Sequence, residues 1–180
     1  GNKARGVTGR GNPVGDPFNI DYVAHEIGHQ FGANHTFNAT TGDCGSGNRS
    51  GANAVEPGSG ITIMGYAGIC GSTNDLSSNS IDIFHGKSLD AIGNFVNSIS
   101  CYSSSATSNN IPVVNAGADY SIPVSTPFSV TGSATDADAG DVLSYCWEQM
   151  DIGPGGDWNT PTGNAPLFRS FLPNSSPTRF

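Results

Sequence analysis

Basic residues are scarce in this sequence: Lys and Arg together number 7, against 15 Asp and Glu, which gives a formal net charge of −8. Because phosphate recognition relies on Lys and Arg, this deficit argues against a nucleic-acid or anionic-membrane partner. Long apolar runs are also missing, and none approaches the ~20 residues that a bilayer crossing needs. We therefore expect neither a nucleic-acid-binding protein nor a membrane span.

Cysteine is sparse, and the sequence contains no CxxC pair, which disfavours a zinc ribbon or a thioredoxin-like redox site. Low lysine content and loops rich in Asn, Ser and Thr are typical of exported proteins, in which widely spaced cysteines form disulfides. The chain starts without an initiator Met, and we expect it to be part of a longer secreted precursor. The four cysteines are Cys44, Cys70, Cys101 and Cys146.

Glycine and proline, by contrast, are abundant: the 180 residues include 25 Gly and 11 Pro. They describe a turn-rich globular protein rather than a helical bundle or a charged disordered tail. The length allows one good domain or two small ones.

Two helices are predicted in the first hundred residues. Apolar residues recur at helical intervals in YVAHEIGHQFG, with Asp21 as the expected N-cap and Gly32 where the helix would stop. The stretch SIDIFHGKSLDAIGNFVNSIS, residues 80–100, is predicted as the second helix, which ends just before Cys101. His85, near its start, has no ligand spacing and is expected to be structural.

Composition changes at YSSSATSNN, which predicts a linker over residues 103–110 between a first domain, 1–102, and a second, 111–180. In the second domain PVVNAGADYSIP, TPFSVTGSATD and DVLSYCWEQM alternate apolar and polar residues, as strands of a β-sandwich do. Either this module is incomplete or its remaining strands, around LFRSFL, are weakly signalled. The predicted fold class is α+β, with an all-β immunoglobulin-like sandwich following a mixed domain.

Three of the four histidines lie in HEIGHQFGANH. His25 and His29 are four residues apart, so on a helix both imidazoles leave the same face about one turn apart. Glu26 adjoins the first of them. Gly32 lets the chain turn sharply, so that His35 can return as a third nitrogen ligand. The motif predicts a three-histidine metal site with a carboxylate beside it.

Three neutral nitrogens and an open fourth position are what catalytic zinc prefers, whereas structural sites are closed by four ligands. Zinc lowers the pKa of a bound water toward ~7, and Glu26 as general base can take its proton while the water attacks a polarised carbonyl. Such chemistry hydrolyses amides. A lone HExxH occurs by chance in many proteins, but HExxHxxGxxH fixes five positions and favours zinc.

With a methionine downstream, the chain resembles the metzincin zinc metallopeptidases, in which this signature is followed by a methionine turn beneath the metal. The resemblance implies that Met64, in TIMGYAGIC, forms a hydrophobic floor under the ligands. It looks closest to the reprolysin-like enzymes of secreted bacterial proteins, which often carry immunoglobulin-like or PKD-like modules. Tyr66 stands where astacins and serralysins have a tyrosine that stabilises the oxyanion; here it is either that residue or an ordinary packed tyrosine.

The resemblance covers residues 16 to 101, the C-terminal part of a metzincin catalytic domain. In that family the upstream region supplies a twisted sheet and an edge strand along which substrate lies. We therefore expect an intact metal site here, with a cleft that lacks its upper wall.

Cys44 and Cys70 flank the long loop and the methionine turn, and a bridge between them would contribute on the order of 3 kcal/mol by closing that loop. Cys101 competes for either partner. Cys146 pairs with Cys101, pairs outside the chain, or stays buried and free. Glu56 is either a loop anchor or a residue at the rim of the cleft.

The TDADAGD loop offers carboxylates of the kind that bind calcium in extracellular β modules. Because the full twelve-residue loop is missing, solvated turn aspartates are the alternative reading of the same residues. The calcium candidates are Asp136, Asp138 and Asp141.

Together these observations predict a secreted zinc-dependent endopeptidase acting on protein or peptide substrates, with calcium as a second candidate ligand. The alternative is a non-catalytic, zinc-containing binding or adhesion fragment of a multidomain secreted protein. Glu26 argues against this alternative, because a structural zinc site needs no base beside its ligands. Substrate preference and oligomeric state do not follow from the sequence.

Overall fold

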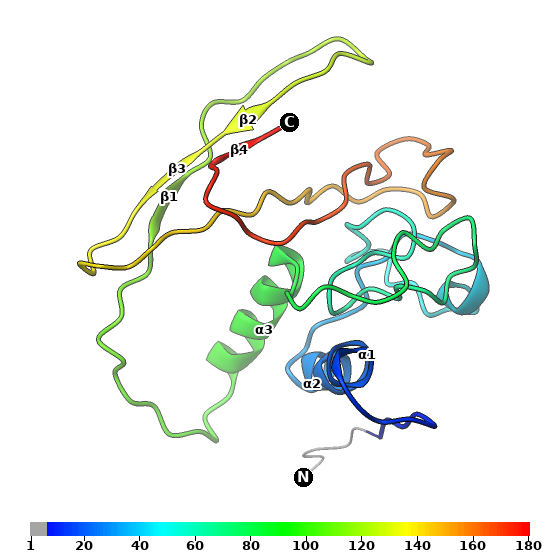
Figure 1. Cartoon of the computed structure of the whole chain (residues 1–180), viewed down its shortest axis with the longest axis horizontal. Coiled ribbons are helices and arrows are strands. Elements are labelled where there is room, and N and C mark those ends of the chain that lie inside the picture. Colours follow the sequence, from blue (N-terminus) through cyan, green and yellow to red (C-terminus); the bar gives the residue numbers. More distant parts are fainter. Residues whose placement is uncertain (1–6) are drawn as a thin grey trace. The chain divides into compact units, whose positions relative to one another are not determined.

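The computed structural model of the chain describes residues 7–180. It forms two compact units (Figure 1). The first contains the described residues up to Ser100 and, from further along the chain, Glu148–Phe171; the second contains Cys101–Trp147 and Leu172–Phe180. Helices and short strands both occur, as expected for an α+β fold. Among the described residues, no helix combines the length and the hydropathy that crossing a bilayer requires.

The first unit starts with one helical stretch in which a π-helical segment separates two α-helical ones. Pro17 lies in its first turn, where the fixed φ suits a helix and the missing N–H breaks no hydrogen bond. The helix therefore begins before Asp21, and the expectation that Asp21 is the N-cap is wrong. Its carboxylate instead accepts a hydrogen bond from Ser80 N, 2.8 Å away. The segments are α1 (Asp16–Phe18), η1 (Asn19–Ala24) and α2 (His25–Gln30).

The second predicted helix is α3 (Gly86–Ser98), which begins later than the apolar spacing indicated. His85 is its N-cap, and the ring accepts a hydrogen bond from Lys87 N. The residues before it are not helical because their backbone pairs with the segment that leads to the predicted methionine turn. Ile81 N donates to Ile61 O, and Ile63 N donates to Ile83 O.

Two small apolar clusters form the core of the first unit. One surrounds the disulfide between Cys44, at the end of the short η2 (Gly42–Cys44), and Cys70, with Tyr66 packed against it. The other contains Met64, which is fully buried. The first cluster also includes Phe37 and Ala39; the second includes Ala33 and Ile63, with Ile20, Ala24, Phe84 and Ile92 packed against it.

Every residue of Glu148–Phe171 is described, and the segment forms neither a helix nor a strand. Hydrogen bonds hold it within the first unit: Asn38 Nδ2 donates to Pro154 O (3.0 Å) and Trp158 N donates to Asn74 Oδ1 (3.1 Å). The domain and linker boundaries expected from the sequence remain predictions. The segment Glu148–Phe171 falls within the predicted second domain, 111–180, but it groups with the first unit.

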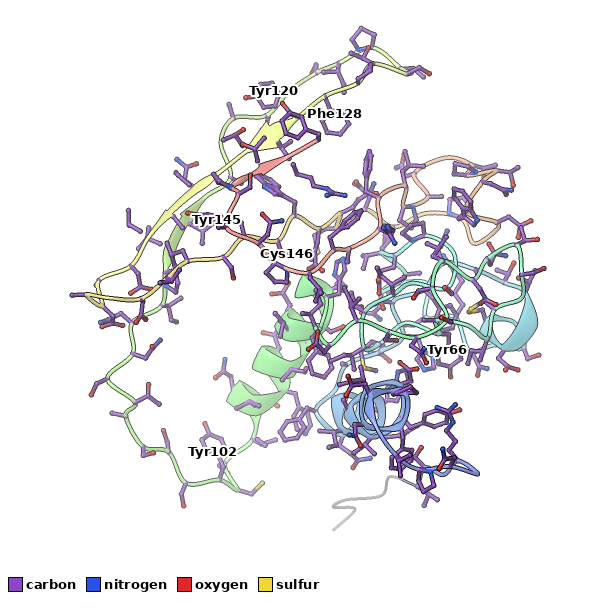
Figure 2. The ribbon with its side chains drawn as sticks, viewed as in Figure 1. Tyr66, Tyr102, Tyr120, Phe128, Tyr145 and Cys146 are labelled. Carbon is purple, nitrogen blue, oxygen red and sulfur yellow. A yellow bond between two sulfur atoms is a disulfide. The ribbon has the colours of Figure 1, made fainter. Side chains whose placement is uncertain are left out.

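The second unit contains two antiparallel sheets of two strands each. The pairs are β1 (Val113–Asn115) with β3 (Ser133–Thr135), and β2 (Val130–Thr131) with β4 (Thr178–Arg179). Apolar side chains stay exposed in this unit: Val114 in β1 is 72% exposed, and Tyr120 in the loop between β1 and β2, shown with Phe128 in Figure 2, is 73% exposed. The LFRSFL stretch forms no strand. The immunoglobulin-like sandwich therefore stays a prediction.

Candidate metal centre

Three imidazoles come together at the end of α2. His25 and His29 lie one turn apart on that helix, with ring centroids separated by 4.8 Å. Gly32 then takes a φ of 87°, the left-handed conformation that favours glycine, as predicted for the residue that ends the helix. The bend returns His35 to within 4.7 Å of His29 and 5.2 Å of His25, measured between ring centroids. One nitrogen of each ring can be chosen so that all three lie within 4.8 Å of one another.

Backbone carbonyls orient all three rings. Because a carbonyl oxygen only accepts, each Nδ1 must carry the proton, and each Nε2 keeps a free lone pair. Metal-ligating histidines typically show this arrangement, in which the second nitrogen donates to a carbonyl or carboxylate. The Nδ1–oxygen distances are 2.7 Å from His25 to Ile63, 2.8 Å from His29 to Ala33 and 2.6 Å from His35 to Asn48.

The Nε2 atoms of His29 and His35 lie 3.0 Å apart. With both protons on Nδ1, two lone pairs face each other at this distance, an arrangement that is unfavourable unless a cation or proton accepts them. A three-nitrogen donor set is suited to zinc. The residues present therefore fit the metal that the motif predicts.

Burial favours the neutral form of two of these imidazoles, those of His25 and His35. The pKa of His25 falls from 6.5 to about 4, chiefly because burial disfavours the charged ring, and the neighbouring histidines lower it further against the opposing contact with Ile63 O. Burial also lowers the pKa of His35, although its contact with Asn48 O opposes the effect. Neutral imidazole is the form that binds a metal, so protons compete weakly at these two rings.

Met64 lies directly against the helix that carries two of the histidines. A methyl group built on Gly28 would overlap Met64 Sδ and approach Phe84 Cε1 to 3.0 Å. Only glycine leaves room for the methionine at this position. Sequence reasoning missed Gly28, although a glycine between two ligands inside a helix is itself a signal of close packing.

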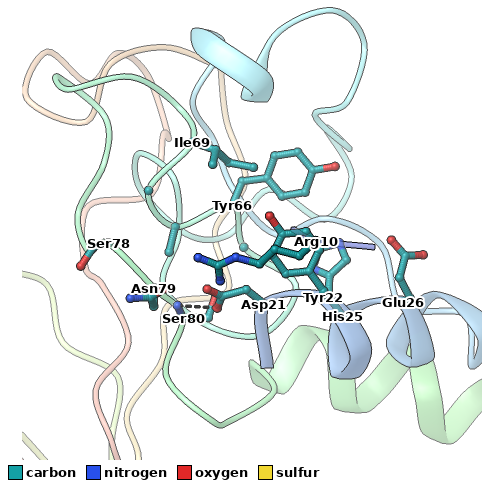
Figure 3. Close-up of a pocket in the computed structure, with 13 residues that line it drawn as sticks. Arg10, Asp21, Tyr22, His25, Glu26, Tyr66, Ile69, Ser78, Asn79 and Ser80 are labelled. Carbon is teal, nitrogen blue, oxygen red and sulfur yellow. Dashed lines mark hydrogen bonds between the residues drawn. The ribbon is translucent and has the colours of Figure 1, made fainter. Parts of the chain in front are cut away.

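Glu26 and Tyr66 both border a pocket of about 350 Å³ beside His25 (Figure 3). Glu26 is half-buried. The Tyr66 ring lies 4.5 Å from that of His35 and 5.6 Å from that of His25, between centroids. Burial, together with Glu26 and Asp43, raises the pKa of Tyr66, so that its hydroxyl remains a hydrogen-bond donor at neutral pH.

The pocket also has lining residues that sequence reasoning did not assign to the site. Asp21 contacts Ser80 N there (Figure 3), and burial raises its pKa despite that hydrogen bond and the nearby positive charge of Arg10. Arg10 lies over the ring of Tyr22, with its guanidinium carbon 5.8 Å from the centroid. No local sequence pattern indicated these residues, because Ser80 lies far along the chain from Arg10 and Asp21.

The remaining predicted residues lie outside this centre. His85 is 1% exposed and caps α3, as expected of a structural histidine. Carboxylate oxygens of the three calcium candidates, Asp136, Asp138 and Asp141, lie within 4.8 Å of one another. Asp138 already accepts two hydrogen bonds from Asn110, and calcium binding there stays a prediction.

A comparison with known families gives a match over the part of the chain that holds the three histidines. Residues 4–87 match the family model described as Metallo-peptidase family M12B Reprolysin-like, and this span contains every residue of the three-histidine site. No curated protein and no solved structure matches the chain. The match supports a metzincin-like metallopeptidase domain in this part of the chain.

Proposed function

We propose that this protein is a secreted, zinc-dependent endopeptidase whose metal is held by His25, His29 and His35. The observation that carries the proposal is the convergence of three imidazoles whose Nδ1 atoms all contact carbonyl oxygens, which leaves three Nε2 lone pairs for one cation. The Reprolysin-like match supports a zinc peptidase. The disulfide between Cys44 and Cys70 supports an extracellular location.

Each side chain of the centre has a distinct task in this proposal. Bound zinc would supply a Lewis acid at the carbonyl to be cleaved. Glu26 removes a proton from the attacking water and later delivers one to the leaving amine. Tyr66, whose hydroxyl is protonated at neutral pH, donates a hydrogen bond to the oxygen that gains negative charge. Met64, buried against Gly28, forms the floor beneath the ligands.

Metal analysis of the purified chain tests the ligand set. We expect one zinc per chain, and its loss in His29→Ala, because two remaining nitrogens cannot hold it tightly. Asn48→Ala is the matched control, because it alters a side chain next to the site but keeps the carbonyl that contacts His35. Zinc that is absent from the unchanged chain, or that persists in His29→Ala, would defeat the proposal.

Peptide hydrolysis tests the role of Glu26. We expect Glu26→Gln to retain zinc and to lose activity by roughly 10²- to 10⁴-fold, the usual contribution of general acid–base catalysis. Tyr66→Phe should keep zinc and lower kcat less severely. Equal hydrolysis by the unchanged chain and Glu26→Gln would contradict the assignment.

A binding or adhesion fragment with a structural zinc is the second candidate. The exposed apolar side chains of the second unit favour it, since exposed apolar surface often marks an interaction site. The predicted immunoglobulin-like module and its calcium candidates belong to this candidate as well. Retained zinc with no Glu26-dependent hydrolysis would favour it over the peptidase.

A further inference from the structure

Glu56 is a buried carboxylate outside the metal-binding motif. It is 1% exposed, so it contacts neither solvent nor a substrate in the pocket. Both of its oxygens are used: Oε2 accepts from the hydroxyls of Thr36 (2.5 Å) and Thr62 (2.5 Å). Oε1 accepts from the backbone amides of Ile61 (2.9 Å) and Thr62 (3.1 Å). Four donors fill the acceptor capacity of the carboxylate.

These donors belong to the two segments that build the metal centre. Thr36 directly follows His35, and Thr62 directly precedes Ile63, whose carbonyl orients His25. The same two segments are joined by one further hydrogen bond, from Thr36 N to Met64 O (3.1 Å). Glu56 therefore connects the segment of the third ligand to the segment that orients the first.

The loop around Glu56 packs closely against this carboxylate. Gly60 adopts a φ of 64°, and a methyl group built on it would lie 3.0 Å from Glu56 Oε2. Glu56 N also donates to Thr36 O (2.9 Å), so that backbone and side chain hold the same neighbour. Because an unsatisfied buried amide or carboxylate is costly, this arrangement tolerates little displacement.

We infer that Glu56 is a positioning residue of the metal centre. Its carboxylate locks the His35 segment to the Ile61–Met64 segment, so that the His35 ring and the Ile63 carbonyl keep the orientation that metal binding requires. This inference rests on the proposed function, because it assigns Glu56 a task only if the three histidines bind a metal. The sequence predicted that Glu56 is either a loop anchor or a residue at the rim of the cleft. Its burial excludes a position at the rim.

Cobalt-substituted protein provides a test that does not depend on peptide hydrolysis, since the visible absorption of bound Co²⁺ reports ligand geometry. Glu56→Gln replaces one acceptor oxygen with an NH₂ group, so the hydroxyls of Thr36 and Thr62 lose their acceptor. We expect a changed spectrum and faster metal release, with a metal affinity that is lower by roughly 10- to 100-fold, the usual effect of losing an outer-shell partner.

Glu148→Gln is the matched control. Glu148 is also a largely buried carboxylate of the first unit, but it accepts from Gly86 N, at the start of α3, and from Ser170 Oγ. The Glu148→Gln substitution should lower the melting temperature and leave the cobalt spectrum unchanged. If Glu56→Gln and Glu148→Gln both lower only the melting temperature, Glu56 is merely structural and the inference fails.

Thr62→Val serves where Glu56→Gln does not fold. It removes one hydroxyl donor, keeps the charge of Glu56, and should shift the spectrum in the same direction by a smaller amount. An unchanged spectrum and release rate in Thr62→Val would overturn the inference while leaving the three-histidine site intact. An unchanged chain that binds neither cobalt nor zinc would instead overturn the proposed function, and the role of Glu56 with it.

Discussion

The two units of the chain are ordered by different means. In the first, fully buried side chains include polar groups such as Glu56 and Thr62 beside Phe37 and Met64. In the second, where all residues of 101–147 and 172–180 are described, none is buried, and backbone pairing of short strands supplies the order. The first unit has little regular structure, and its buried hydrogen bonds and disulfide compensate.

This difference in burial indicates which unit can support a metal-binding site. A site whose rings must keep fixed orientations needs surroundings in which each polar group has a partner. Two-stranded sheets with exposed apolar faces are marginally stable and do not provide such surroundings. The three-histidine cluster accordingly lies in the first unit, whose described residues form no named strand but include many buried polar contacts.

The largest expected difference between the units follows from metal removal. Zinc bound at a thousand times its Kd stabilises the folded state by about 4 kcal/mol, so a chelator should lower the melting temperature of the first unit markedly. Hydrogen exchange measured by mass spectrometry should show faster exchange around α2 and unchanged exchange in β1 to β4. Equal acceleration in both units would break the comparison. His29→Ala should show no further response to chelator.

Removing the disulfide is expected to have the next largest effect. Replacing Cys44 and Cys70 together by Ala should lower the free energy of unfolding by about 3 kcal/mol, because the unfolded chain regains the entropy of the closed loop. Urea unfolding measures the change. Cys101→Ala, at an exposed position, should change stability by less than about 0.5 kcal/mol.

A methyl group added to α2 tests how tightly the core of the first unit is packed. Gly28→Ala should cost about 1–3 kcal/mol, since the added carbon overlaps Met64 Sδ. Gly93→Ala in α3 is the matched control, because a methyl there meets no atom within 4 Å. It should stabilise the chain by up to about 1 kcal/mol through helix propensity. Similar effects of the two substitutions in thermal unfolding would show that Met64 is not tightly packed.

The smallest effect is expected in the second unit. Val114→Thr in β1 should change the free energy of unfolding by no more than about 0.5 kcal/mol, because Val114 is 72% exposed. Val55→Thr, at a fully buried position of the first unit, should cost about 1–3 kcal/mol for burying a hydroxyl. A large loss in Val114→Thr would mean that its strand is covered in solution.

Elements governed by short-range geometry were predictable. The end of α2 at Gly32 and the facing of His25 and His29 follow from helical periodicity and the backbone freedom of glycine. The starts of the two helices were not. The first begins at Asp16 with Pro17 in its first turn, before the apolar spacing sets in, and the second begins late because the residues before α3 pair with Ile61 and Ile63.

Residue types and spacing were enough to predict that three histidines would gather beside Glu26, since residues four apart on a helix return to the same face and Gly32 allows the bend that brings back His35. Only the folded chain decided which nitrogen of each ring is free. The carbonyls of Ile63, Ala33 and Asn48 select it, and two of these come from other segments. The surroundings of Glu56 were also decided only by the folded chain. Its four donors come from the segments around Thr36 and Thr62, which the fold brings together and no local sequence pattern predicts.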